Sequence, residues 1–219
     1  MKPVAVQNER GMKVVIFGAS GGTGVHVVKQ ALEAGHEVTA FVRDPSRLPV
    51  QHERLRVLQG DVVESEKVAE AVAGQDAVLS ALGPAKPAFT AMTVGAQHII
   101  AAMQRHGVRR LITLTGAGVA DSNDRPGVLN RVITFLLKRI NPEVLADAQR
   151  HVDRVRASDL DWTVVRVGRL LDRPGMGELR VGWVGIGTRP FISRADAATF
   201  MLNQLADTAH HRQAPMISN

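Results

Sequence analysis

The segment KVVIFGASGGTG near the N-terminus holds the clearest pattern of residues able to do chemistry. Gly18, Gly21 and Gly24 stand there at G-x-x-G-x-x-G spacing, directly after an apolar run and before a helical pattern. The first glycine permits a tight turn, the second lets the backbone approach a phosphate, and the third lets a helix pack closely on a strand. N–H groups at the helix N-terminus then bind the anion. The spacing predicts a dinucleotide-binding loop, and no Lys-Ser or Lys-Thr pair follows it to form a nucleotide-hydrolysing P-loop.

The sequence FVRDPSRL at the end of the next apolar run distinguishes between NAD and NADP. An acidic residue at this place binds the ribose 2′-hydroxyl of NAD, whereas basic groups bind the 2′-phosphate of NADP. Arg43 occupies the place, and Ser46 and Arg47 follow one turn later, which supplies two guanidinium groups and a hydroxyl for one phosphate. Asp44 either pairs with Arg43 or accepts a hydrogen bond from a ribose hydroxyl. The spacing favours NADPH (NADP+) over NADH as the cofactor.

Two residue types, Cys and Tyr, are absent from the 219-residue chain. The absence of Cys excludes disulfides, thiolate nucleophiles and Cys-ligated metals. The absence of Tyr excludes a phenol as general acid or base. The histidines have no metal-ligand spacing, so we expect no metal site. Asp147 and His151 lie four residues apart on one face of a predicted helix, and we interpret them as a surface contact rather than a catalytic couple.

Apolar runs rich in β-branched residues alternate with segments of helical period through most of the chain. Runs that are apolar throughout are typical of parallel strands covered by helices on both faces. This order predicts an α/β fold, a doubly wound parallel sheet (Rossmann fold), in a single domain of residues 12–219 that follows an N-terminal tail, 1–11. The predicted strands cover 13–18, 37–42, 55–59, 76–82, 111–115 and 162–167, and the predicted helices cover 22–34, 65–73, 90–106 and 143–158.

Two segments interrupt the alternation. Residues 127–140 form a predicted amphipathic helix, which packs on its own domain or across a dimer contact, or else serves as a substrate lid or lies on a membrane surface. Residues 168–190, with six Gly and two Pro, follow the sixth strand and so border the crevice at the carboxyl ends of the strands. We interpret them as a substrate-binding wall, with Arg169 and Trp183 as contacts, or as an edge hairpin over the core. Together with residues 116–127 they are the expected substrate-side loops.

The charge balance, 27 basic against 21 acidic residues, favours small anionic ligands. The arginines are scattered along the chain, which argues against nucleic acid as the primary partner. No apolar stretch reaches the roughly 18 to 20 residues that cross a bilayer, and the N-terminus has no apolar signal segment. We expect a cytoplasmic monomer or homodimer.

Six segments, taken in order along the chain, resemble the atypical short-chain dehydrogenase/reductases. More closely, they resemble the NAD(P)H-binding group that contains NmrA-like proteins and biliverdin-IXβ reductase, also called flavin reductase. The segments are GASGGTG, VRDPSRLP, GDVVESEKVAEAVAGQDAVLSALG, GAQHIIAAMQRHGVRRLITLTGAGV, LDWTVVRVGRL and ISRADAATFMLNQLAD. The resemblance implies a cofactor site with Gly18, Ser20, Gly21, Gly22, Thr23, Gly24, Arg43, Ser46 and Arg47 at the phosphates, Asp61 and Val62 near the adenine, and Leu82, Gly83 and Pro84 beside the nicotinamide.

The sequence departs from this group at the positions of catalysis. The Tyr-x-x-x-Lys pair of the classical members is absent, and Gly116 and Arg169 stand where biliverdin-IXβ reductase carries a Ser and a His. A flavin, a quinone or a tetrapyrrole-like pigment fits these departures, because such an acceptor takes hydride readily and its proton from water. We therefore predict an NADPH-dependent reductase of a small conjugated acceptor, with Thr115, Gly116 and Arg169 at the catalytic site. The alternative is an NmrA-like, non-catalytic NADP-binding redox sensor that acts through a protein partner.

Overall fold

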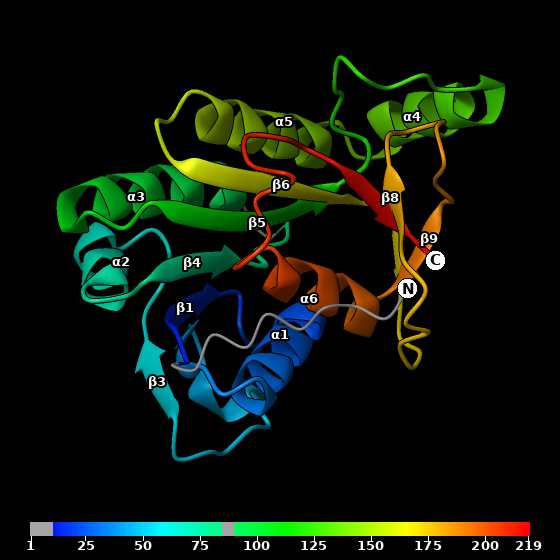
Figure 1. Ribbon diagram of the computed structural model, residues 1–219. Helices are drawn as coiled ribbons and strands as arrows, with labels where there is room; N and C mark the ends of the chain where they lie inside the picture. Colours follow the sequence, from blue (N-terminus) through cyan, green and yellow to red (C-terminus); the bar gives the residue numbers. More distant parts are fainter. Residues whose placement is uncertain (1–10, 85–89) are drawn as a thin grey trace.

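The computed structural model describes residues 11–84 and 90–219. Its centre is an eight-stranded sheet in the order β3-β2-β1-β4-β5-β6-β10-β8, in which only β8 runs antiparallel to its neighbour (Figure 1). The strands are β1 (Lys13–Phe17), β2 (Glu37–Val42), β3 (Leu55–Gln59), β4 (Ala77–Ser80), β5 (Arg110–Gly116), β6 (Asp161–Val167), β8 (Arg180–Gly182) and β10 (Met216–Ser218). The predicted doubly wound parallel sheet is confirmed, although β4 ends earlier than expected because the following residues leave the sheet.

Helices cover both faces of this sheet (Figure 1). The helices of the described chain are α1 (Gly22–Glu33), α2 (Ser65–Val72), α3 (Ala91–His106), α4 (Val128–Ile140), α5 (Pro142–Arg156) and α6 (Arg194–Asn203), with a short 3-10 helix η1 (Pro45–Arg47) after β2. Helices α1 and α6 pack on one face, and α2, α3 and α5 pack on the other.

Alternate residues of each central strand face the two helical layers, which explains why the strands are apolar throughout. In β1, Val14 and Ile16 face α1 and α6, whereas Val15 and Phe17 face α2, α3 and α5, and all four are fully buried. A strand with only one apolar face would give one of the two helical layers no apolar surface to pack against. Strands that are apolar on both faces therefore account for the three-layer architecture.

The glycine-rich segment 168–190 does not form the edge hairpin considered from the sequence. Its first strand, β7 (Arg169–Leu171), pairs in parallel with β9 (Phe191–Ser193) in a separate two-stranded sheet. Its second strand, β8, instead pairs with β10 near the C-terminus and extends the main sheet. Both partners lie outside the segment, so local sequence could not reveal either pairing.

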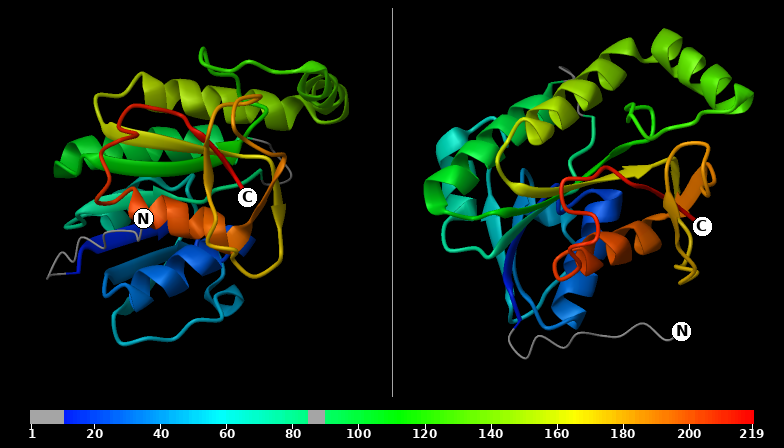
Figure 2. Two further views of the ribbon diagram at one scale, coloured as in Figure 1. Left: turned by 45° about the vertical axis from the view of Figure 1, so that its right-hand side comes forward. Right: turned by 45° about the horizontal axis from the view of Figure 1, so that its top comes forward.

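Helix α4 projects from the outer corner of the molecule beyond α5, on the side where β8 and β9 lie (Figure 2). On its described side chains, Val128, Val132, Phe135, Leu136 and Ile140 are between 48% and 80% exposed. The helix is present as expected, and on its described residues these apolar side chains are half or more exposed rather than buried in the core of their own domain. Its role at a dimer contact, as a lid or on a membrane surface stays a prediction.

Candidate active site

The turn after β1 has the geometry that a dinucleotide pyrophosphate requires. Gly18 has φ +72°, and a Cβ there would lie 2.7 Å from the carbonyl oxygen of Ala81. A Cβ on Gly24 would overlap the carbonyl oxygen of Gly18, so only glycine lets α1 begin this close to the strand. Gly21 is the N-cap of α1, without a capping side chain, and the first turn of α1 has no acidic residue. The N–H groups of this turn are thus not capped by a local carboxylate.

A cleft of about 410 Å³ opens at this turn, along the carboxyl ends of β1, β2, β3 and β4. Open α/β sheets bind ligands at this edge. The lining residues are Gly18, Ser20, Gly21, Phe41, Val42, Arg43, Arg47, Gly60, Asp61, Val62, Ala81, Leu82, Gly83, Pro84 and Ala91. The structure thus brings together most of the cofactor residues predicted from the sequence. Gly22, Thr23, Gly24 and Ser46 belong to the same turns but are not part of this lining.

Two arginines form the basic end of the cleft. Arg43 precedes the N-cap of η1 and Arg47 is its last residue, and both are exposed. Asp44, whose role the sequence left open, caps η1 by accepting hydrogen bonds from the backbone N of Ser46 at 3.0 Å and from its Oγ at 2.6 Å. These bonds lower the pKa of Asp44. The carboxylate therefore bonds to Ser46 and forms no ion pair with Arg43.

The middle of the cleft is shaped by the turns that follow β2 and β3. A Cβ on Gly60 would come 2.7 Å from Cζ of Phe41, so the ring packs closely against this turn. The carbonyl oxygen of Val62 lies 2.8 Å from Nδ1 of His98 on α3, and Asp61 Oδ1 accepts a hydrogen bond from the backbone N of Val63. The sequence analysis missed Phe41 and Gly60 as lining residues, although their position at strand ends could have indicated them.

The opposite end of the cleft is apolar and is lined by Ala81, Leu82, Gly83, Pro84 and Ala91. These residues lead from β4 toward the start of α3, and none of them is titratable. The described lining of the cleft thus has charged groups at one end and an apolar wall at the other.

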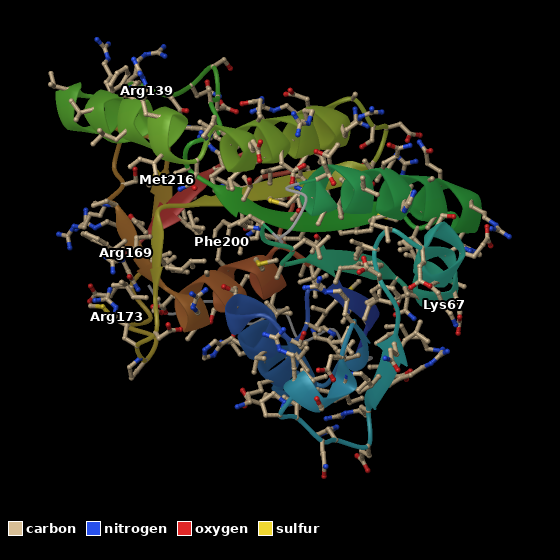
Figure 3. The ribbon with its side chains drawn as sticks, turned by 180° about the vertical axis from the view of Figure 1, so that it is seen from behind. Lys67, Arg139, Arg169, Arg173, Phe200 and Met216 are labelled. Atoms are coloured by element: carbon tan, nitrogen blue, oxygen red, sulfur yellow. The ribbon has the colours of Figure 1, made fainter. Side chains whose placement is uncertain are left out.

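The three residues predicted for catalysis lie outside the lining of the cleft. Thr115 and Gly116 end β5, in register with Arg166 and Val167 of β6, and Arg169 begins β7. Thr115 is 3% exposed, and its Oγ1 has no hydrogen-bond partner in the described part of the chain. Gly116 and Arg169 are exposed. Figure 3 shows Arg169 and Arg173 at one end of the molecule and Lys67 of α2 at the other.

Asp147 and His151 are buried, so their interpretation as a surface contact is wrong. Asp147 of α5 accepts hydrogen bonds from the backbone N of Met92, at 3.2 Å, and of Thr93, at 3.1 Å, and thereby caps α3. His151 lies 3.0 Å from Thr113 Oγ1 through Nε2 and 3.1 Å from the carbonyl oxygen of Met92 through Nδ1. Burial lowers the pKa of His151. The pair holds the start of α3 beside the cleft. The sequence could not show this, because the contacts are made with α3 and β5, which are distant in sequence.

A buried ion pair joins the two substrate-side loops. Arg166 is fully buried on β6, and its Nη1 and Nη2 each donate to Asp124 at 2.8 Å. Asp124 Oδ1 also accepts from the backbone N of Val184 at 3.0 Å. Although burial acts to raise it, the hydrogen bonds from Arg166 and the backbone hold the pKa of Asp124 below its usual value. Trp183, expected as a substrate contact, has its ring 5.7 Å from Cζ of Arg166.

The described residues contain no cluster of three or more His, Cys, Asp or Glu side chains able to bind a metal ion. Within the same residues, none of the helices has the length and apolar character needed to span a membrane.

The fold and the cleft together define a Rossmann-type protein that binds a dinucleotide at the carboxyl edge of its sheet. Residues 18–208 match the family model described as NAD(P)H-binding, and the chain belongs to this family. The NAD(P)H-binding group indicated by the sequence is therefore confirmed, and the glycine cradle of the first turn fits the pyrophosphate of such a cofactor.

Among sequence relatives, the chain is 27% identical to YwnB of Bacillus subtilis over 208 residues, which cover 92% of this chain and 96% of that protein. It is 35% identical to a 3-beta-hydroxysteroid dehydrogenase of Mycolicibacterium neoaurum over 113 residues, 46% of this chain. The matched part is 31% of that enzyme, so the chain spans only about a third of its length.

Solved structures show the same fold. A short-chain dehydrogenase/reductase from Veillonella parvula in complex with NADP has a TM-score of 0.81 at 21% identity, covering 95% of this chain and 94% of the other. ChuY, an anaerobillin reductase from Escherichia coli O157:H7, has a TM-score of 0.76 at 21% identity, covering 94% of this chain and 96% of its own.

Proposed function

We propose that the protein is an NADPH-dependent reductase of a small conjugated acceptor such as a flavin, a quinone or a tetrapyrrole. The observation that carries this proposal is the polarity of the cleft. Arg43 and Arg47 lie at one end, and the apolar wall around Leu82 and Pro84 lies at the other. A site of this kind binds a phosphorylated dinucleotide in one orientation and places its nicotinamide ring against the apolar wall.

The 2′-phosphate of NADPH is the anion that we expect Arg43 and Arg47 to bind at the basic end of the cleft. Asp44 accepts hydrogen bonds from Ser46 and forms no ion pair with Arg43 or Arg47, so its carboxylate does not occupy the N–H donors of the two guanidinium groups. Paired guanidinium groups bind phosphate through charge-assisted hydrogen bonds. The similar fold of the Veillonella parvula enzyme, whose structure contains NADP, is consistent with this preference.

The acceptor follows from the chemistry of the other end. NADPH, when bound, supplies a hydride from C4 of its nicotinamide ring, and the acceptor then takes a proton from water while NADP+ is left. Leu82, Pro84 and Ala91 offer the reacting rings an apolar surface to pack against, which is the proximity contribution to the rate. We place Thr115, Gly116 and Arg169 on the acceptor side, where Arg169 binds an acidic substituent of the acceptor. The shared fold with an anaerobillin reductase supports a tetrapyrrole among the candidates.

Helix α4 favours a second candidate function, a redox sensor that binds the dinucleotide and signals through a protein partner. Its exposed Phe135, Leu136 and Ile140 form an apolar surface of the kind that binds other proteins. Turnover distinguishes the two functions, because a sensor binds NADPH without oxidising it. In either case we place the protein in the cytoplasm, as a monomer or homodimer.

The test is NADPH oxidation, followed by absorbance, with a panel of flavins, quinones and linear tetrapyrroles. We expect saturable turnover with at least one acceptor class, and a KM for NADPH below that for NADH. In the Arg43→Ala/Arg47→Ala variant this preference should fall by at least tenfold, since about 1.5–3 kcal/mol is typical of each lost hydrogen bond to a charged group. Absence of turnover with every acceptor, together with tight NADPH binding, would replace the reductase with the sensor.

A further inference from the structure

Arg194 lies against the phosphate-binding turn, although the two are far apart in sequence. It is the first residue of α6, which packs beside α1 (Figure 1). A Cβ added to Gly22 would lie 3.0 Å from Nε and 3.1 Å from Cζ of Arg194. Nη1 of Arg194 lies 3.4 Å from Oγ1 of Thr23. The guanidinium therefore covers the first turn of α1, and the absence of a side chain at Gly22 makes room for it.

The charge at this helix end is the opposite of the usual arrangement. A helix N-terminus carries a partial positive charge, which is commonly balanced by an acidic or capping side chain. Helix α1 has neither: Gly21 caps it without a side chain, and no acidic residue lies in the first turn. The side chain that contacts the turn is instead that of Arg194, whose Nε is paired with Asp172. The Nη groups of this guanidinium and the N–H groups of the turn are all donors to an anion.

Asp172 holds the guanidinium in this position. Its Oδ1 accepts a hydrogen bond from Nε of Arg194 at 2.7 Å, and it follows β7 in the substrate-side segment. The Asp172 side chain is 81% exposed and that of Arg194 is 27% exposed, so the pair is open to solvent beside the turn. A guanidinium has five N–H donors, and the contacts to Asp172 and Thr23 use two of them.

We propose that Arg194 binds the pyrophosphate of the dinucleotide, opposite the N–H groups of α1, and that Asp172 orients it. Arg194 thus supplies the charge for the pyrophosphate, as Arg43 and Arg47 do for the 2′-phosphate. The proposal rests on dinucleotide binding by this cleft and is independent of the acceptor.

The test measures three dissociation constants by titration calorimetry, for NADP+, NAD+ and 2′-AMP. NAD+ has the pyrophosphate without the 2′-phosphate, and 2′-AMP has the 2′-phosphate without the pyrophosphate. Arg194→Ala should weaken NADP+ and NAD+ by the same factor, about tenfold to a hundredfold, and leave 2′-AMP within about twofold. Arg43→Ala/Arg47→Ala should show the opposite pattern, weakening NADP+ and 2′-AMP while sparing NAD+.

Arg105→Ala is the matched control, since it removes an exposed arginine of α3 that pairs with Glu66 outside the cleft. It should leave all three constants unchanged. Arg194→Lys keeps the charge and the alkyl chain and should give an intermediate loss for NAD+. If Arg194→Ala does not fold, Arg194→Lys and Arg194→Gln provide the same comparison.

Unchanged NAD+ affinity in the Arg194 variants, or an equal loss for 2′-AMP, overturns the proposal. The Arg43→Ala/Arg47→Ala variant tests a different claim. If it leaves the ratio of the NADP+ and NAD+ dissociation constants unchanged while the Arg194 variants behave as expected, the assignment of the 2′-phosphate to Arg43 and Arg47 is wrong and the pyrophosphate contact stands. Failure to find an acceptor likewise leaves these constants unaffected.

Discussion

Replacing Asp124 by alanine tests whether the buried ion pair holds the two substrate-side loops together. Arg166 is fully buried, and Asp124 accepts from both of its Nη groups at 2.8 Å. The variant leaves an uncompensated guanidinium in the core, and breaking such a pair costs about 3–5 kcal/mol. Because the carbonyl oxygens of Val119 and Ala214 still accept from Arg166, we expect a loss of about 3 kcal/mol in the free energy of unfolding.

Urea unfolding followed by tryptophan fluorescence measures this loss, and Trp183 beside Arg166 should report the disruption. Glu70→Ala is the control, since Glu70 pairs on the surface with Lys67 and with Arg56, each at 3.4 Å, and exposed pairs of this kind are worth less than about 1 kcal/mol each. The double variant Asp124→Leu/Arg166→Met removes both charges and should be more stable than Asp124→Ala. Equal losses for Asp124→Ala and Glu70→Ala would refute the reasoning.

Other substitutions test the core, the phosphate turn and the exposed helix. His151→Asn should flatten the dependence of stability on pH. Burial lowers the pKa of His151 below its ordinary value of 6.5, so the unfolded chain binds more protons and stability falls as the pH drops through this range. Urea titrations at about pH 8 and pH 5.5 measure the difference, and an unchanged slope contradicts the expectation. Gly24→Ala should lose about 2–3 kcal/mol, because the new Cβ overlaps a backbone carbonyl. Gly127→Ala, where a Cβ meets open space, is its control in thermal denaturation, and equal melting temperatures would contradict the clash. Phe135→Ser on α4 should change stability by less than about 0.5 kcal/mol, since Phe135 is 57% exposed, whereas Phe17→Ala in the core should cost about 3–5 kcal/mol. A large loss at Phe135 would show that α4 packs against another surface in solution.

The sequence predicted the parallel sheet because its central strands pack against helices on both faces and are therefore apolar throughout. Such a strand can be recognised from its own residues, without knowledge of the strands beside it. Strands β7 to β10 were not predicted. Each is three residues long, and their partners lie far away in sequence, as in the pairing of Arg180 with Ser218. So short a strand has no periodicity that local sequence could reveal.

Local sequence also located most of the cofactor cleft. Glycines in the turn after one strand and arginines after the next strand lie at the carboxyl edge of the sheet because of their position relative to the strand ends. It misplaced Asp147 and His151 on the surface. Helical spacing shows that two residues share a face but not what covers that face, and only the packing of α5 on α3 and β5 decided it. Asp44 was undecided for a related reason, since its hydrogen bonds to Ser46 depend on the conformation of η1.

The sequence by itself determined the phosphate turn, the basic end of the cleft and the absence of a phenol or thiol from any mechanism. These properties depend on residue type and on spacing over a few residues. Only the tertiary structure decided that Arg194 covers the turn at Gly22 and that Arg166 and Asp124 tie the two loops together. Such contacts join residues tens to more than a hundred positions apart, and the packing of whole helices and strands brings them within hydrogen-bond distance.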